Sequence, residues 1–225
     1  MANKLCTPAP VLCICAATFP LYASTTSRPV LSLQCTIDAP GETAQIRSKA
    51  RDVVYRPSKH ELRVRVGGKV LSFRDRLPYD APLEGTRYYF CDRVGGYTLL
   101  KKEHEDEFSG VLINESTSQV SAAGYKVLFS YDRRAYFSEL QQNGMDGELW
   151  RIYTEGGKLS WAGTSFVLDE NRSAAILLSR PHWASDGEFK AYASCAATPF
   201  YHSVSTLKKL DGHWTWHPLP NCGLH

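Results

Sequence analysis

Apolar and polar residues alternate along much of this chain in short stretches that end at pairs of turn residues. Residues 62–66 alternate leucine or valine with arginine, Gly67 and Gly68 follow, and residues 70–73 resume the apolar pattern. Both glycines accept the positive φ that a tight hairpin turn requires, so the pattern predicts a β-hairpin. It recurs at three further turns: Gly95–Gly96, Gly156–Gly157 and Asp211–Gly212. No segment has a comparably clear 3.6-residue period, and an all-β, antiparallel fold is predicted.

Several landmarks recur along the chain at a spacing of about 55 residues. Residues 111–115 match 166–170, Phe129–Asp132 matches Trp183–Asp186, and Gly157 with Trp161 matches Gly212 with Trp216. We therefore predict a duplicated unit at about 111–161 and 166–216, in which Trp161 and Trp216 are equivalent core residues. Each copy has room for about four strands, which is the size of a propeller blade.

One part of the repeat resembles a known blade motif. Residues 181–192 read PHWASDGEFKAY and resemble the Pro-x-Trp-Ser-Pro-Asp-Gly motif of TolB-like and WD-type β-propellers. The earlier copy, residues 129–134, keeps the aromatic residue, the serine and the aspartate, but Arg133 replaces the glycine. The resemblance implies a small or partial β-propeller, a scaffold that usually binds other molecules. A β-sandwich is the alternative.

The amino terminus is typical of an export signal. No charged residue occurs between Lys4 and Arg28, and the apolar stretch between them is too short and too rich in proline for a membrane span. We expect a signal peptide at 1–23 and a single β-rich domain at 24–225, which would be periplasmic or secreted without stable membrane insertion.

Four cysteines remain after removal of the predicted signal: Cys35, Cys91, Cys195 and Cys222. An even number of isolated cysteines in an exported chain favours disulfides over a zinc site, which would need closely spaced pairs. Of the three pairings that four cysteines allow, we expect Cys35 with Cys91 and Cys195 with Cys222.

Composition excludes several classes of protein. The chain has 225 residues, of which 43% are hydrophobic and 22% charged, values that fit neither a disordered nor a multi-span membrane protein. The 26 lysines and arginines face 23 acidic residues, a net charge of +3, and no basic stripe stands out. We expect a protein partner and no nucleic acid, and the oligomeric state stays open.

Candidate chemistry is sparse. His213 and His217 are four residues apart on a predicted strand, about 13 Å, which is too far for both to bind one ion. We expect no metal, no cofactor and no catalytic residue. Trp214 and Trp216 should face inward, whereas His182, His213 and His217 are candidate residues of a binding surface. Asp132 and Asp186 occupy equivalent turns and should share one structural role.

These features favour an exported, non-catalytic binding module that recognises a protein or an envelope component, such as an inhibitor or immunity-type protein. The motifs of serine hydrolases, zinc proteases, dinucleotide-binding proteins and P-loop proteins do not occur in the chain. The alternative is an extracytoplasmic hydrolase whose catalytic residues converge only in the folded protein.

Overall fold

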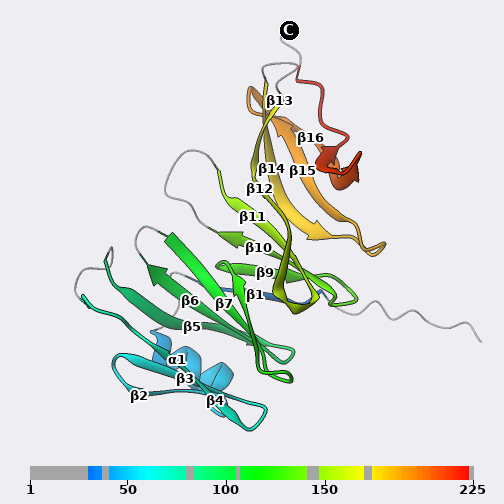
Figure 1. The fold of residues 1–225 in the computed structure, drawn as a ribbon. Helices are drawn as coiled ribbons and strands as arrows, with labels where there is room; N and C mark the ends of the chain where they lie inside the picture. The colour runs from blue at the N-terminus through cyan, green and yellow to red at the C-terminus, as the bar shows by residue number, and fades with distance from the viewer. Residues whose placement is uncertain are drawn as a thin grey trace, which may run out of the picture.

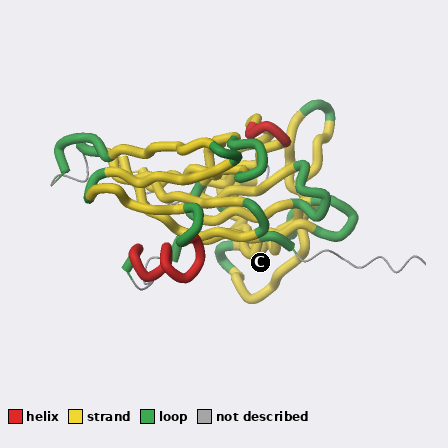
Figure 2. The backbone as a smooth tube through the Cα atoms, turned by 90° about the horizontal axis from the view of Figure 1, so that it is seen from below, coloured by secondary structure: helices red, strands yellow, loops and turns green. Residues whose placement is uncertain are grey.

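The computed structural model describes residues 30–36, 41–79, 84–104, 107–140, 147–169 and 174–222. The predicted signal peptide, residues 1–23, lies outside these ranges. The fold is mostly antiparallel β, which confirms the predicted class. Within the described ranges, no helix has the length and apolar character needed to cross a bilayer. Viewed from below, strands make up most of the molecule and the helical segments lie at its periphery (Figure 2).

The described residues form four antiparallel sheets that follow one another across the molecule (Figure 1). The first contains β2 (Val54–Ser58), β3 (Glu61–Val66) and β4 (Lys69–Arg74). The second contains β5 (Thr86–Val94), β6 (Tyr97–His104), β7 (Glu107–Asn114) and β8 (Gln119–Ala123). The third contains β1 (Ser32–Gln34), β9 (Lys126–Phe129), β10 (Ala135–Leu140), β11 (Leu149–Thr154) and β12 (Lys158–Thr164). The fourth contains β13 (Phe166–Asp169), β14 (Ala174–Trp183), β15 (Phe189–Cys195), β16 (Thr198–Leu210) and β17 (His213–His217).

The glycine pairs act as the sequence predicts. Gly67 and Gly68 join β3 to β4 with φ angles of 54° and 76°, a backbone that residues with a Cβ adopt only at a cost. Hairpins also form at Gly95–Gly96 and at Asp211–Gly212, while a 3₁₀ turn, Glu155–Gly157, joins β11 to β12. The other helical structure in the described ranges is α1 (Glu42–Gln45), which continues as a π-helical segment, Ile46–Ala50.

Among the residues that the structure describes, three apolar layers join consecutive sheets. Leu62, Leu100 and Ile113 lie in the layer between the first and second sheets. Because successive side chains on a strand point to opposite faces, neighbouring residues enter different layers. Leu99 packs between the second and third sheets, and Phe137 between the third and fourth. The second and third sheets are therefore covered on both faces, whereas the first and fourth each have an outward face.

The amino-terminal strand joins the third sheet rather than the first. Strand β1 pairs with β9, and Leu33, which is fully buried, lies opposite Val127. A disulfide between Cys35 and Cys91 connects this segment to β5 of the second sheet, with the Cα atoms 4.6 Å apart. A second disulfide, Cys195–Cys222, connects β15 to the carboxyl-terminal tail over 5.5 Å. The structure thus contains both expected pairings.

Some residues that recur in the predicted repeat lie at corresponding positions of the third and fourth sheets, and others do not. Phe129 and Trp183 end β9 and β14, and Trp161 and Trp216 lie on β12 and β17, the last strands of the third and fourth sheets. Residues 111–114 lie instead in β7 of the second sheet, whereas 166–169 form β13 of the fourth. The strand of the third sheet that corresponds to β13 is β1, because it pairs with β9 as β13 pairs with β14.

The tryptophans of the last strands meet between the third and fourth sheets. The Trp161 and Trp216 rings are 5.9 Å apart, edge to face. Trp216 is buried, whereas Trp161 is half-buried at the edge of the layer. Trp214 is 41% exposed, so the expectation that it packs inward is wrong: it pairs with Lys209 near the end of the hairpin, beyond the packed layer.

Candidate functional sites

The three candidate histidines do not form one site. His182 and His217 lie in one row across the fourth sheet, His182–Lys190–Thr206–His217, and three strand spacings separate them by about 14 Å. His213 stands at the start of β17, four residues before His217. In the described ranges, no group of three or more histidine, cysteine, aspartate or glutamate residues could hold a metal ion.

Asp132 and Asp186 do share a structural role. The Asp132 carboxylate accepts a hydrogen bond from the Arg134 backbone N–H at 3.0 Å, and Asp186 accepts one from the Glu188 N–H at 2.9 Å. These backbone bonds, assisted by Ser130 at Asp132 and by Lys190 at Asp186, lower the pKa of both carboxyls. Both aspartates therefore brace the turn that follows the aromatic residue of the repeat.

A pair of carboxyls, the buried Glu139 and the half-buried Glu148, lies at the end of the third sheet opposite the Asp132 turn. The Tyr125 hydroxyl donates a hydrogen bond to Glu139 and lies 3.1 Å from Glu148 Oε1. Lys126 Nζ is 3.3 Å from Glu139 Oε2, and the Trp150 indole N–H donates to Glu148 Oε2 at 3.3 Å. Burial raises the pKa of Glu139 and the Glu148 carboxylate adds to the rise, against the opposing effects of Tyr125 and Lys126.

Sequence reasoning missed this pair because its members are distant along the chain. Tyr125 precedes β9, Glu139 lies near the end of β10, and Glu148 precedes β11. Each of the four carboxylate oxygens has a partner within the fold, and the Glu139 side chain is 7% exposed. The two carboxyls can share a proton, and their oxygens are already hydrogen-bonded or ion-paired within the fold.

Basic residues are concentrated at the end of the molecule that the first sheet forms. Residues 47–76, which include the first sheet, contain ten lysines and arginines against three acidic residues, a net charge of +7. The other residues of the chain carry 16 basic and 20 acidic side chains, a net charge of −4. The overall charge of +3 conceals this division, so the conclusion that no basic stripe stands out is wrong.

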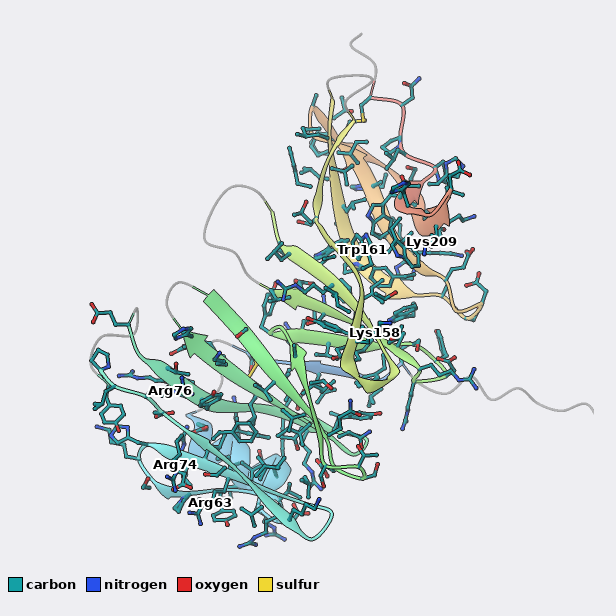
Figure 3. All side chains as sticks on the ribbon, viewed as in Figure 1. Arg63, Arg74, Arg76, Lys158, Trp161 and Lys209 are labelled. Atoms are coloured by element: carbon teal, nitrogen blue, oxygen red, sulfur yellow. A yellow bond between two sulfur atoms is a disulfide. The ribbon has the colours of Figure 1, made fainter. Side chains whose placement is uncertain are left out.

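The strand pattern brings arginines onto the outward face of the first sheet. Leu62, Val64 and Val66 are buried against the second sheet, so the residues between them, Arg63 and Arg65, point away from it. Arg74 lies across from Glu61 on the neighbouring strand. Arg76 follows β4 and is exposed beside this face, where its backbone pairs with Thr86 of β5. Figure 3 shows Arg63, Arg74 and Arg76 together at this end of the molecule. We call Arg63, Arg65, Arg74 and Arg76 the basic face.

Local contacts hold parts of the basic face in place. Glu61 accepts hydrogen bonds from Ser72 Oγ at 2.5 Å and from Arg63 Nε at 2.7 Å, while Arg74 Nε is 3.6 Å away. Chiefly through the Ser72 and Arg63 bonds, these neighbours lower the pKa of Glu61 to about 2. The Arg65 guanidinium lies 4.4 Å from the centre of the Tyr55 ring. The face is therefore partly ordered before any partner binds.

Comparisons with known proteins leave the family open. No protein-family model matches this chain, and no curated protein or solved structure has significant similarity to it. The resemblance to the propeller blade motif therefore rests on the residues of the motif alone.

Proposed function

We propose that this protein is an exported, non-catalytic binding module that recognises a protein partner with an acidic surface through its basic face. The observation that carries the proposal is the division of charge: a net +7 within residues 47–76 and −4 over the rest. Four arginines of that segment belong to one end of the molecule, where no other sheet formed by the described residues covers them. Such a patch steers and orients an oppositely charged partner.

The composition of the face favours a protein over a uniform polyanion. Arginine and tyrosine are enriched where proteins bind one another, and Tyr55 carries the Arg65 guanidinium on its ring. Glu61 stands between Arg63 and Arg74 and would repel a continuous row of phosphates or sulfates. A protein surface can instead place carboxylates against the arginines and a donor against Glu61.

Two further observations support the export and scaffold parts of the proposal. The two disulfides fit an oxidising compartment, either the periplasm or the exterior of the cell. The stack of four antiparallel sheets, with the motif residues Phe129 and Trp183 at corresponding strand ends, supports a partial β-propeller. The Trp183 indole N–H also donates to the Leu128 carbonyl of the third sheet at 2.9 Å, so the motif tryptophan bridges two sheets.

The hydrolase alternative has one observation in its favour, the Glu139–Glu148 pair. Retaining and inverting glycosidases need two carboxyls about 5–10 Å apart with substrate between them. Here one tyrosine hydroxyl contacts both carboxyls, and every oxygen has a partner within the fold. The pair therefore supports a structural role better than a hydrolytic one. The leading proposal, a binding module, includes an inhibitor or immunity-type role.

The experiment compares two variants that lose the same number of charges. Arg65→Gln/Arg74→Gln alters the basic face, whereas Lys158→Gln/Lys209→Gln alters exposed lysines of the third and fourth sheets (Figure 3). A partner captured from the native envelope or culture fluid is identified, and its Kd is measured by calorimetry at low and high salt.

We expect the arginine variant to weaken binding at least about tenfold and the lysine variant to leave it unchanged. Higher salt should weaken binding of the unaltered protein. Equal losses in both variants would contradict the proposal, as would a partner that binds the arginine variant normally. Binding of heparin or DNA with the same arginine dependence, and of no protein, would replace the acidic protein with a polyanion.

A further inference from the structure

A cavity opens between the second and third sheets, away from the basic face. Its volume is about 130 Å³, enough for a small organic group. Strands β6, β7 and β8 line one side, and the turns β9–β10 and β11–β12 line the other. Its lining residues include Asn114, Gln119, Ser121, Arg133, Arg134 and Tyr136.

The lining combines positive charge, neutral hydrogen-bonding groups and an aromatic wall. Arg133 and Arg134 are the charged residues among its described lining, and no carboxylate accompanies them there. Tyr97, Phe129 and Tyr136 contribute rings, with centroids 4.3 Å apart for the first two and 5.6 Å for the last two. The Arg134 side chain is 81% exposed and 4.0 Å from Asp132, so it stands at the mouth of the cavity.

Arg133 adopts a backbone conformation that disfavours arginine. Its φ is 61°, in the left-handed region, where a Cβ is strained. The corresponding turn of the fourth sheet has Gly187 at this position, with φ 85°. Both turns close with the same bond, from the Arg133 N–H to the Ser130 carbonyl and from the Gly187 N–H to the Ala184 carbonyl, each 2.9 Å.

The two turns have the same backbone conformation but different residues at the left-handed position. The turn requires a left-handed residue, and glycine meets that requirement without strain in the fourth sheet. The third sheet instead has an arginine, which is exposed and is one of the residues that line the cavity. Strain that the turn itself does not need indicates a role for the side chain.

We propose that this cavity binds the oxyanion group of a small organic acid, with Arg133 and Arg134 as its cationic ligands. The planar guanidinium groups match the geometry of a carboxylate, phosphate or sulfate. The neutral groups of Asn114, Gln119 and Ser121 can bind further polar atoms, and the aromatic wall suits a ring or another apolar part of the ligand. This site is separate from the basic face and does not depend on the function proposed for it.

The test is an NMR titration with three anions of different origin: benzoate, glucuronate and inorganic phosphate. Benzamide and glucose serve as the uncharged counterparts of the two organic acids. We expect saturable shifts of the backbone amides of Arg133, Arg134, Gly156 and Gly157 with at least one anion, and none with benzamide or glucose. Which anion binds distinguishes an aromatic acid, a sugar acid and free phosphate.

Two variants make the result specific. Arg133→Gly has a native precedent in Gly187, so it should fold, and it should weaken anion binding at least tenfold. Arg74→Gln, on the basic face, should leave anion binding unchanged, while Arg133→Gly should leave binding of the acidic protein partner unchanged. The two proposals can therefore fail separately. Absence of saturable shifts with all three anions, equal shifts with an uncharged counterpart, or unaltered binding by Arg133→Gly would overturn the inference.

Discussion

Replacing Trp216 with alanine should destabilise the protein more than any change at the nearby histidines. Trp216 is 6% exposed and lies in the apolar layer between the third and fourth sheets. Its ring contacts Trp150 and Trp161 of the third sheet at 6.0 and 5.9 Å, and Phe189 of its own sheet at 5.9 Å. Truncation would leave a cavity that borders both sheets.

The expected loss follows from burial and from the contacts of the ring. Removal of a buried tryptophan side chain costs about 3–5 kcal/mol of unfolding free energy. At about 2–4 °C per kcal/mol for a domain of this size, Trp216→Ala should lower Tm by about 6–20 °C. The Trp216 indole N–H has no hydrogen-bond partner among the described residues, so Trp216→Phe removes an unsatisfied donor and should cost much less.

The assay is calorimetry together with urea unfolding followed by circular dichroism, because fluorescence would change with the tryptophan itself. The matched control is His213→Gln/His217→Gln, at two exposed positions of the same strand, which should alter stability by no more than about 0.5 kcal/mol. A Trp216→Ala protein as stable as the parent would refute the assignment of Trp216 to the core. Loss of stability in the histidine variant, with zinc protecting only the parent, would refute the exclusion of a metal.

Three further predictions concern stability. Arg133→Gly should raise the unfolding free energy by about 0.5–1 kcal/mol, since relief of left-handed strain outweighs the added flexibility of glycine in the unfolded chain; a lower Tm would contradict this. Because the pKa of Glu139 is raised by burial, the folded state binds an extra proton and stability should fall as pH rises from the ordinary carboxyl range through the raised value. Glu139→Gln should reduce this fall in unfolding free energy, measured by urea unfolding between pH 4 and 8. An unchanged dependence of the unfolding free energy on pH would contradict the raised pKa of Glu139. Replacing both Cys195 and Cys222 with serine should cost about 3–4 kcal/mol, because a loop of this length is no longer closed in the unfolded chain; an unchanged urea midpoint would contradict this.

Features that depend on neighbouring residues could be predicted from the sequence. The alternation at 62–66 and the pair Gly67–Gly68 specify a hairpin because strand periodicity and positive φ are local properties. The turns at Asp132 and Asp186 are equally local, since each aspartate binds a backbone N–H two residues ahead. The fold class and the repeated turn could be predicted from the sequence for this reason.

Features that depend on which sheets meet could not be predicted in this way. Strand β1 joins the third sheet, and the landmark at 111–115 begins in the second, because burial requires an apolar strand without specifying its neighbours. The Glu139–Glu148 pair and the cavity beside Arg133 each gather residues from separate strands and turns. The high number of arginines in residues 47–76 can be counted in the sequence. The exposure of those arginines, however, requires that the first sheet lies at the end of the stack, and that position follows from packing among all four sheets.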